Sequence, residues 1–320
     1  MSTIWKTNIS VIWWANTELT IDAEGAIKYG AKTQGIHRDS IGGWAYNRIV
    51  SLLNLGNTEI APFLTLWEDS NGDTIVRSLQ EKWLKISPER VKWLATPHST
   101  IINNSEKGES AIMTKTNESF PFFFNFVRSK IDTIFSTPYL VITHVHWEQK
   151  DDSVVKELIQ KSPLDSNIFT NFGRTQISFG LEYWKDIIDE KISIFQLNLE
   201  EAKTFFWCAD ISEIIQYIKN NFKKTNFLIT LWEDWNCIIT PSGSIHVQYK
   251  LDFRPKICTT NWAWDVFWSA FLDQTIKKWG PNNLDCLTSS LLFATNTALN
   301  HCLGNKKDID YMSHFNSGKV

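Results

Sequence analysis

The amino-acid sequence predicts an α/β fold with a central, mostly parallel sheet and helices on both of its faces. Apolar runs typical of buried strands occur at 9–12, 192–197 and 227–230, and segments with apolar residues at helical spacing lie between them. Strands that alternate with helices along a chain form such sheets. With 320 residues, 43% of them hydrophobic, the chain is long enough to bury a large core.

The first third of the chain follows this alternation. A strand at 9–12 precedes a polar segment, and Gly42 and Gly43 form a turn before a helical pattern over 47–55. Two apolar segments around a polar turn in 100–114 are typical of a β-hairpin. Further elements are expected as strands at 64–66, 140–146, 192–197, 227–230, 237–240, 244–249 and 256–258 and as helices at 74–84 and 284–303.

Composition and charge exclude several classes of function. The net charge of −3 lacks the basic excess that nucleic acids and membrane surfaces attract, so neither is expected as a partner. There is no N-terminal signal pattern and no apolar run long enough to span a bilayer. The five cysteines are widely spaced, without a C-x-x-C pair, which favours neither a disulfide framework nor a zinc site. We expect a cytoplasmic protein.

One carboxylate occupies a position suited to catalysis. Apolar residues recur at helical spacing over 266–276, and Asp265 falls on the expected first turn of that helix. The free N–H groups and the positive dipole end of a helix N-terminus attract anions. An acid beside them can take a proton from a nucleophile while a phosphate rests on the amides, so this stretch predicts a kinase-like arrangement.

Residues 260–267, TNWAWDVF, resemble the T-G-A-G-D-A-F signature of the ribokinase/PfkB carbohydrate kinase family, if tryptophan is read where the family has glycine. Further motifs resemble the family's I-G-G-x-N, G-G-x-x-x-N, N-x-x-E and T-L-G-E-D-G at 12–16, 42–47, 198–201 and 230–235. The resemblance spans roughly 9–304. It implies a ribokinase-like domain over 1–304, with a small β-sheet lid from about 15–43 and 98–116, and a polar C-terminal tail over 305–320.

The resemblance also implies a reaction, which is ATP-dependent phosphorylation of a hydroxyl group on a sugar or nucleoside. Asp265 would be the catalytic base, and the backbone at Trp262, Ala263 and Trp264 would form the anion hole. Substrate-binding residues carried over from the family are Asn16, Glu18, Gly42, Gly43 and Asn47, with Glu18 standing where the family more often has Asp.

The nucleotide end of the site is implied in the same way. Asn198 and Glu201 would organise Mg²⁺ through water, although an Asn followed three residues later by Glu is also the pattern of a helix cap. Nucleotide-binding residues carried over are Thr230, Trp232, Glu233 and Asn296. Family resemblance further allows activation by a monovalent cation and a homodimer formed through the lid.

Tryptophan stands at several positions where the family has glycine, and Trp83, Trp207 and Trp268 also fall where relatives often carry glycine. The chain has 16 Trp and 14 Gly, whereas an average glycine content of about 7% would give roughly 22. One hypothesis is that UGA codons translated here as tryptophan are read as glycine in the source organism, as in some bacterial lineages. Drift in an inactive kinase would instead scatter substitutions over many residue types.

Two other functions stay open at this level. If the tryptophans are genuine, indole rings at 262 and 264 fill the anion hole, and the chain is a catalytically dead sugar- or nucleoside-binding pseudokinase. His144 and His146 share one face of an expected strand and suggest a metal-dependent hydrolase, but no third ligand is evident. The sequence does not choose between a sugar and a nucleoside.

Overall fold

The computed structural model describes the chain in thirteen segments. They are residues 9–12, 15–23, 34–84, 86, 88–92, 95–104, 109–115, 120–143, 145, 148–231, 235–248, 263–278 and 284–302. His144, His146, Trp262, Trp232 and Glu233 lie outside these segments, as does the tail over 305–320.

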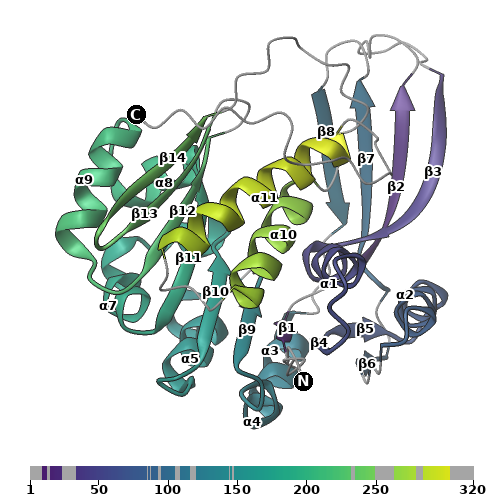
Figure 1. The fold of residues 1–320 in the computed structure, drawn as a ribbon. Helices are drawn as coiled ribbons and strands as arrows, with labels where there is room; N and C mark the ends of the chain where they lie inside the picture. Colours follow the sequence, from purple (N-terminus) through teal and green to yellow (C-terminus); the bar gives the residue numbers. More distant parts are fainter. Residues whose placement is uncertain are drawn as a thin grey trace, which may run out of the picture.

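A mostly parallel sheet forms the centre of the molecule (Figure 1). Its strands are β1 (Ile9–Ile12), β4 (Ile60–Phe63), β9 (Tyr139–Ile142), β10 (Asn167–Asn171), β11 (Ile192–Asn198), β12 (Asn226–Thr230), β13 (Trp235–Thr240) and β14 (Gly243–Gln248). They lie in the order β14-β13-β12-β11-β10-β9-β1-β4, and only β13 and β14 run antiparallel to their neighbours. All residues of β1 and β12 are buried, as expected where both faces of a parallel sheet are covered. The predicted α/β architecture is confirmed.

A second sheet stands beside the first, at the upper right of Figure 1. Its strands are β2 (Asn16–Ala23), β3 (Gly35–Gly42), β7 (His98–Asn104) and β8 (Glu109–Lys115), in the order β3-β2-β7-β8. The hairpin expected in 100–114 is the antiparallel pair β7 and β8. All four strands come from the two segments assigned to a lid by the family resemblance. A short parallel pair, β5 (Thr65–Trp67) and β6 (Glu89–Val91), lies below them.

Helices cover both faces of the main sheet. They are α1 (Trp44–Asn54), α2 (Ser70–Glu81), α3 (Phe120–Ser129), α4 (Ile131–Ile134), α5 (Val154–Lys161), α6 (Arg174–Ser178), α7 (Leu181–Lys191), α8 (Leu199–Phe206), α9 (Ile211–Asn221), α10 (Ala263–Lys277) and α11 (Leu284–Cys302), with a 3₁₀ turn at Lys150–Asp152. α10 packs against α1 and α11 in front of the sheet in Figure 1, and α5, α7, α8 and α9 lie on its other side.

Aromatic side chains fill the layer between the sheet and α8. Phe195 and Phe227 are fully buried on neighbouring strands, and Phe172 and Phe205 pack on Phe195 with ring centroids 4.6 and 5.8 Å away. Edge-to-face contacts at these distances add to the burial energy of each ring. The cluster fixes the position of the strand ends that lead into the candidate site.

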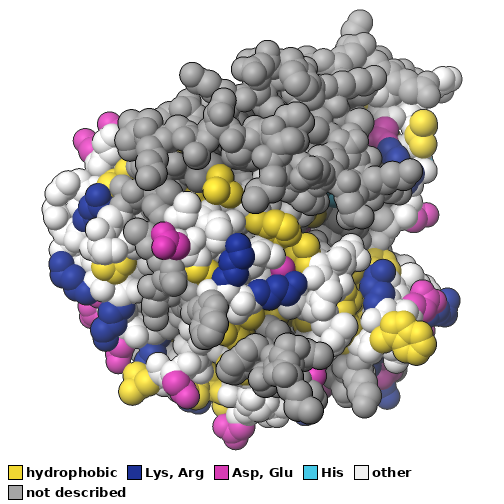
Figure 2. All heavy atoms as spheres, viewed as in Figure 1, with side chains coloured by type: hydrophobic (Ala, Val, Ile, Leu, Met, Phe, Trp, Pro, Cys, Tyr) yellow, Lys and Arg dark blue, Asp and Glu magenta, His cyan; other side chains and the backbone are white. Residues whose placement is uncertain are grey.

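The described surface is mixed in charge. On the face shown in Figure 2, Lys and Arg side chains are interspersed with Asp and Glu side chains, in keeping with the small net charge. Among the described helices, none combines the length and the apolarity that a membrane span requires.

Candidate active site

Polar residues end three neighbouring parallel strands of the main sheet. Asn171 ends β10, Asn198 ends β11 and Thr230 ends β12, and Asn198 is paired in register with Thr230. Carboxyl ends of parallel strands meet at one edge of a sheet, and ligands of open α/β sheets bind outside that edge. Two of the residues expected near the nucleotide therefore lie side by side at the edge where a ligand is expected.

One hydrogen bond in the site joins two motifs that are far apart in the sequence. The Nδ2 atom of Asn47, in α1, donates a hydrogen bond of 2.9 Å to Oδ2 of Asp265, across 218 residues of sequence. Asp265 lies in the first turn of α10, and its side chain is 14% exposed. The fold therefore brings the expected substrate motif to the expected catalytic base.

Arg48, which the sequence analysis did not single out, accompanies this pair. It is 2% exposed, its Nε lies 3.7 Å from Oδ1 of Asp265, and its Nη2 donates a bond of 2.9 Å to Oδ1 of Asn171. Its guanidinium also lies 5.5 Å from the ring centroid of Trp268. The Nε and Nη1 groups have no hydrogen-bond partner among the described residues. Arg48 thus places a buried positive charge next to the candidate base.

Burial and charge act in opposite directions on Asp265. Burial raises the pKa of its carboxyl, while Arg48, Asn47 and the more distant charge of His301 lower it, and the net shift is upward. Burial lowers the pKa of Arg48 to about 10, so this side chain stays cationic at neutral pH. Without its positive neighbour, Asp265 would be still harder to ionise.

The residues expected to bind substrate lie where the second sheet meets α1. Asn16 and Gly42 are paired in register on β2 and β3, and a Cβ atom at Gly42 would overlap the carboxylate of Glu18. A larger residue at 42 would therefore require the side chain of Glu18 to move. Nδ2 of Asn16 donates a bond of 2.6 Å to Oγ of Ser99, whereas Oδ1 of Asn16 is buried without a partner among the described residues.

Asn47, like Asn16, has a side-chain oxygen without a hydrogen-bond partner among the described residues. Its Nδ2 is bonded to Asp265, and its Oδ1 is buried without a partner among the described residues. Buried polar atoms in native proteins are normally hydrogen-bonded, so each orphaned oxygen indicates a missing donor. Hydroxyl groups of a bound substrate are donors of the right kind. Gly43 lies between β3 and α1, and its φ of 89° is a backbone conformation that favours glycine.

Asn198 and Glu201 form the helix cap that their spacing allows. Oδ1 of Asn198 accepts a bond of 2.8 Å from the N–H of Glu201, and Oε2 of Glu201 accepts one of 2.9 Å from the N–H of Asn198. Burial raises the pKa of Glu201, while the bond from Asn198 and the charge of Arg174 lower it, with a net upward shift. No group of three or more His, Cys, Asp or Glu side chains suited to a metal occurs among the described residues. A hydrated Mg²⁺ is compatible with this pair because water supplies most of its ligands.

The remaining predicted residues fall on elements around the same edge. Thr230 is buried, and its Oγ1 donates to the carbonyl oxygen of Leu197 at 3.4 Å. Asn296 is half-buried on α11, which packs against α10 and β13. Ala263 begins α10, and Trp264, 42% exposed, stands in its first turn beside Asp265. The assignment of Thr230 and Asn296 to nucleotide binding stays a prediction.

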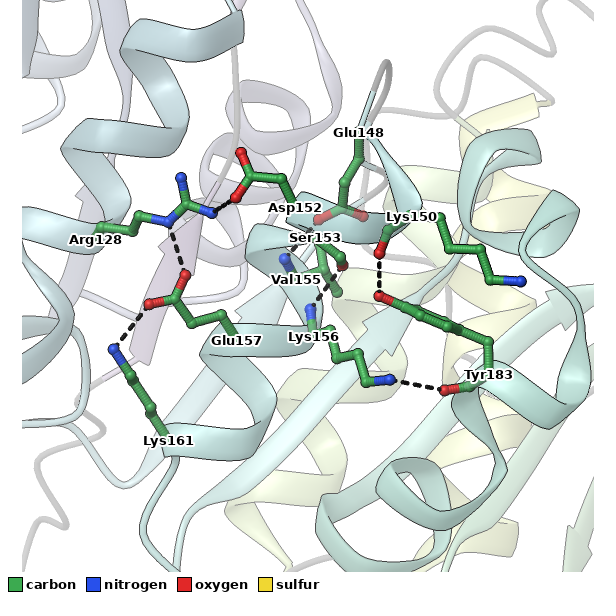
Figure 3. A network of polar contacts seen from close by, with 10 residues as sticks. All are labelled: Arg128, Glu148, Lys150, Asp152, Ser153, Val155, Lys156, Glu157, Lys161 and Tyr183. Carbon is green, nitrogen blue, oxygen red and sulfur yellow. Dashed lines mark hydrogen bonds and ion pairs between the residues drawn. The ribbon is translucent and has the colours of Figure 1, made fainter.

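Glu148, a buried carboxylate, lies beside the start of α5 (Figure 3). Oε1 of Glu148 accepts a bond of 2.7 Å from the N–H of Val155 at the start of α5, and Oε2 accepts one of 2.9 Å from Nε2 of Gln176. Burial raises the pKa of Glu148. Both bonds end on structural groups, so Glu148 ties α5 to α6 rather than facing a ligand.

Figure 3 also shows a network of charged side chains that are partly exposed at the protein surface. Arg128 contacts Asp152 and Glu157, and Nζ of Lys161 lies 2.8 Å from Oε1 of Glu157. These contacts join α3 to α5 and contribute little to stability because the charges are partly exposed.

A groove of about 600 Å³ lies beside α7, α8 and α9 and contains none of the predicted site residues. It is lined mainly by Phe179, Tyr183, Phe206, Trp207 and Tyr217.

Comparison with known proteins identifies the architecture. A search of protein-family models finds no match, and a search of curated proteins finds none similar enough in sequence. Solved structures do match: ribokinase from Giardia lamblia aligns with a TM-score of 0.77 at 18% identity, over 94% of this chain and 95% of that one. The chain has the ribokinase-like fold. The family resemblance seen in the sequence motifs is confirmed at the level of the fold.

Other solved structures share the ribokinase-like fold with this chain. Ribokinase from Thermotoga maritima aligns at 16% identity with a TM-score of 0.69, over 93% of each chain. Phosphofructokinase-2 from Escherichia coli, in complex with fructose-6-phosphate, aligns at 14% identity with a TM-score of 0.73, over 93% of this chain and 94% of that one. The match extends over nearly the whole of each protein.

Proposed function

We propose that the chain is a kinase that transfers the γ-phosphoryl group of ATP to a hydroxyl group of a sugar or nucleoside. The observation that carries the proposal is the hydrogen bond between Asn47 and Asp265, because it joins a substrate motif to an acid at the start of a long helix. The structural neighbours, ribokinase and phosphofructokinase-2 in complex with fructose-6-phosphate, support a sugar as acceptor.

In the proposed mechanism each residue has one task. Substrate hydroxyls donate to the unpaired oxygens of Asn16 and Asn47, which orients the acceptor. Asp265 takes the proton of the attacking hydroxyl, and Arg48 keeps that carboxylate ionised. Backbone N–H groups at the start of α10 face the negative charge that develops on the phosphoryl group.

Two further groups complete the proposal. When bound near Asn198 and Glu201, Mg²⁺ would neutralise charge on the phosphates. The sheet of β2, β3, β7 and β8 would act as the lid that excludes water from the transfer. A homodimer through this sheet and activation by a monovalent cation belong to the same proposal as secondary features.

The test is ATP turnover with a matched pair of variants. The purified chain is supplied with Mg²⁺, ATP and a panel of sugars and nucleosides, and ADP release is measured. Asp265→Asn should lower kcat by about 10²- to 10⁴-fold, the usual contribution of a general base. Asp285→Asn changes an exposed acid in the first turn of the adjacent helix α11 and should leave turnover unchanged. Full turnover by Asp265→Asn would refute the assignment.

Binding without catalysis is the second candidate, and the position of Trp264 favours it. An indole in the first turn of α10 competes for the space beside Asp265 that a phosphoryl group requires. A chain of this kind would bind one member of the panel in a calorimetric titration and release no ADP with any of them. Loss of that binding in Asn16→Ala would place the ligand at the proposed substrate end.

A further inference from the structure

Two helix ends have a backbone conformation that suits glycine and not tryptophan. Among the described residues other than glycine, only Trp83 and Trp207 have a positive φ, at 65° and 57°. In this left-handed region the Cβ atom crowds the following carbonyl oxygen, and for a bulky residue the conformation is an outlier. Both outliers in the described part of the chain are therefore the same residue type.

The end of α1 shows what the motif requires. Gly56, with φ 88°, follows the last turn of this helix, and its N–H donates to the carbonyl oxygen of Leu53 at 2.9 Å. The N–H of Asn57 donates to the carbonyl oxygen of Leu52 at 3.0 Å. This pair of bonds is the Schellman motif, whose left-handed position is usually glycine.

The end of α2 repeats the motif with tryptophan in place of glycine. The N–H of Trp83 donates to the carbonyl oxygen of Gln80 at 2.9 Å, and that of Leu84 to the carbonyl oxygen of Leu79 at 3.3 Å. Both bonds have the same spacing as in α1. Trp83 therefore occupies the position that Gly56 occupies at the end of α1.

The end of α8 is closed in a similar way. Trp207 has φ 57° and ψ 40°. The N–H of Cys208 donates to the carbonyl oxygen of Lys203 at 3.2 Å, and this is the Schellman bond that spans five residues, equivalent to the bond from Asn57 to Leu52 in α1. The indoles gain little in return for the strain, since Trp83 is 94% exposed and Trp207 is 87% exposed. Packing does not explain either residue.

Trp184 shows the ordinary use of tryptophan in the same chain. It lies inside α7 and is fully buried, and its ring centroid is 4.5 Å from that of Phe172. Its Nε1 donates a bond of 2.8 Å to the carbonyl oxygen of Gln176. Both the apolar body and the polar group of this indole are satisfied, as expected for a buried tryptophan.

We infer that residues 83 and 207 of the natural protein are glycine, encoded by UGA in an organism that reads UGA as glycine, and that Trp184 is a true tryptophan encoded by UGG. The geometry at α2 and α8 selects the two positions independently of any function. Extension of the same rule to 264, where it would clear the first turn of α10 for a phosphoryl group, rests on the proposed function.

The direct test reads the codons in the source gene and the peptide masses of the protein isolated from its own organism. UGA at 83 and 207 with UGG at 184, and peptides lighter at 83 and 207 by the mass of an indole side chain, are the expected results. UGG at 83 and 207 would overturn the inference. So would UGA at 184 as well, because the organism would then read UGA as tryptophan.

Unfolding of three variants provides a second test that is independent of catalysis. Trp83→Gly and Trp207→Gly relieve strain and lose little burial, so each should raise Tm by about 1–3 °C. Trp184→Gly removes a packed, hydrogen-bonded side chain and should lower Tm by several degrees, as an internal control. Lower Tm in both Trp83→Gly and Trp207→Gly would contradict the inference. Trp83 and Trp207 follow the C-terminal ends of α2 and α8 and have no task in the proposed mechanism, so a failure here would not reflect on the proposed kinase activity.

Discussion

Removal of the buried charge of Arg48 should change the pH at which the enzyme becomes active. The acidic limb of a plot of kcat/KM against pH reports the pKa of the essential base in the free enzyme. Burial already raises the pKa of Asp265, and Arg48 opposes that shift. Arg48→Met removes the positive charge that lowers the pKa of Asp265. Asp265 then stays protonated to higher pH, and the acidic limb of the profile moves to higher pH.

The size of the shift follows from the separation of the two charges. At 3.7 Å, two unit charges in a medium with an effective dielectric constant of about 20 interact with about 4.5 kcal/mol, which corresponds to about 3 pH units. The 14% exposure of the Asp265 side chain allows some screening by water. We therefore expect an upward shift of about 1–3 pH units, the usual range for a carboxyl that loses a positive neighbour.

The assay is ADP release at subsaturating acceptor over a series of buffers. Arg48→Lys retains the charge and should restore most of the parental profile, and circular dichroism checks that each variant is folded. Arg128→Met, a change of the same kind in a partly exposed residue of α3, should leave the profile unchanged. An active Arg48→Met enzyme with the parental acidic limb would refute this role of Arg48.

Three further predictions concern the cap of α8, which Asn198 and Glu201 form, and the buried carboxylate of Glu148. Asn198→Ala removes the cap of α8 and should cost about 1 kcal/mol of unfolding free energy. Glu201→Gln keeps an oxygen that can accept from the N–H of Asn198, so it should raise the Mg²⁺ concentration needed for half-maximal activity with little loss of Tm; unchanged Mg²⁺ dependence would leave Glu201 a purely structural residue. Because the pKa of Glu148 is raised in the folded state, the Glu148 carboxyl of the unfolded chain loses its proton at a lower pH, near 4.5, than that of the folded chain. Unfolding free energy should then fall with pH up to the folded-state pKa, and Glu148→Gln should flatten this dependence in thermal unfolding experiments; an unchanged slope would contradict the shift.

Local sequence patterns determined the fold class and many of the elements. The alternation of apolar runs and helical spacing depends on backbone periodicity, which each segment carries in itself. The same kind of local signal located the cap formed by Asn198 and Glu201 and the acid at the start of α10. It did not assign α3, whose sequence FPFFFNFVRS is apolar at nearly every position and shows no clear period.

Contacts between distant segments required the tertiary structure. Asn47 and Asp265 are 218 residues apart, and no local pattern shows that their side chains meet. Arg48 appears in the sequence as one cation in a helical pattern, a residue type that is usually exposed, and only the packing of α1 against α10 buries it beside Asp265.

The tryptophans show the same division. The sequence has more tryptophan than glycine, and the family resemblance marks 83 and 207 as glycine positions, but neither observation shows the conformation or the burial of these residues. The backbone dihedral angles and the exposure of the indoles show that Trp83 and Trp207 are strained and unpacked, whereas Trp184 is buried. Dihedral strain and side-chain burial are properties of the folded chain, because each depends on how a helix ends and on what packs against it.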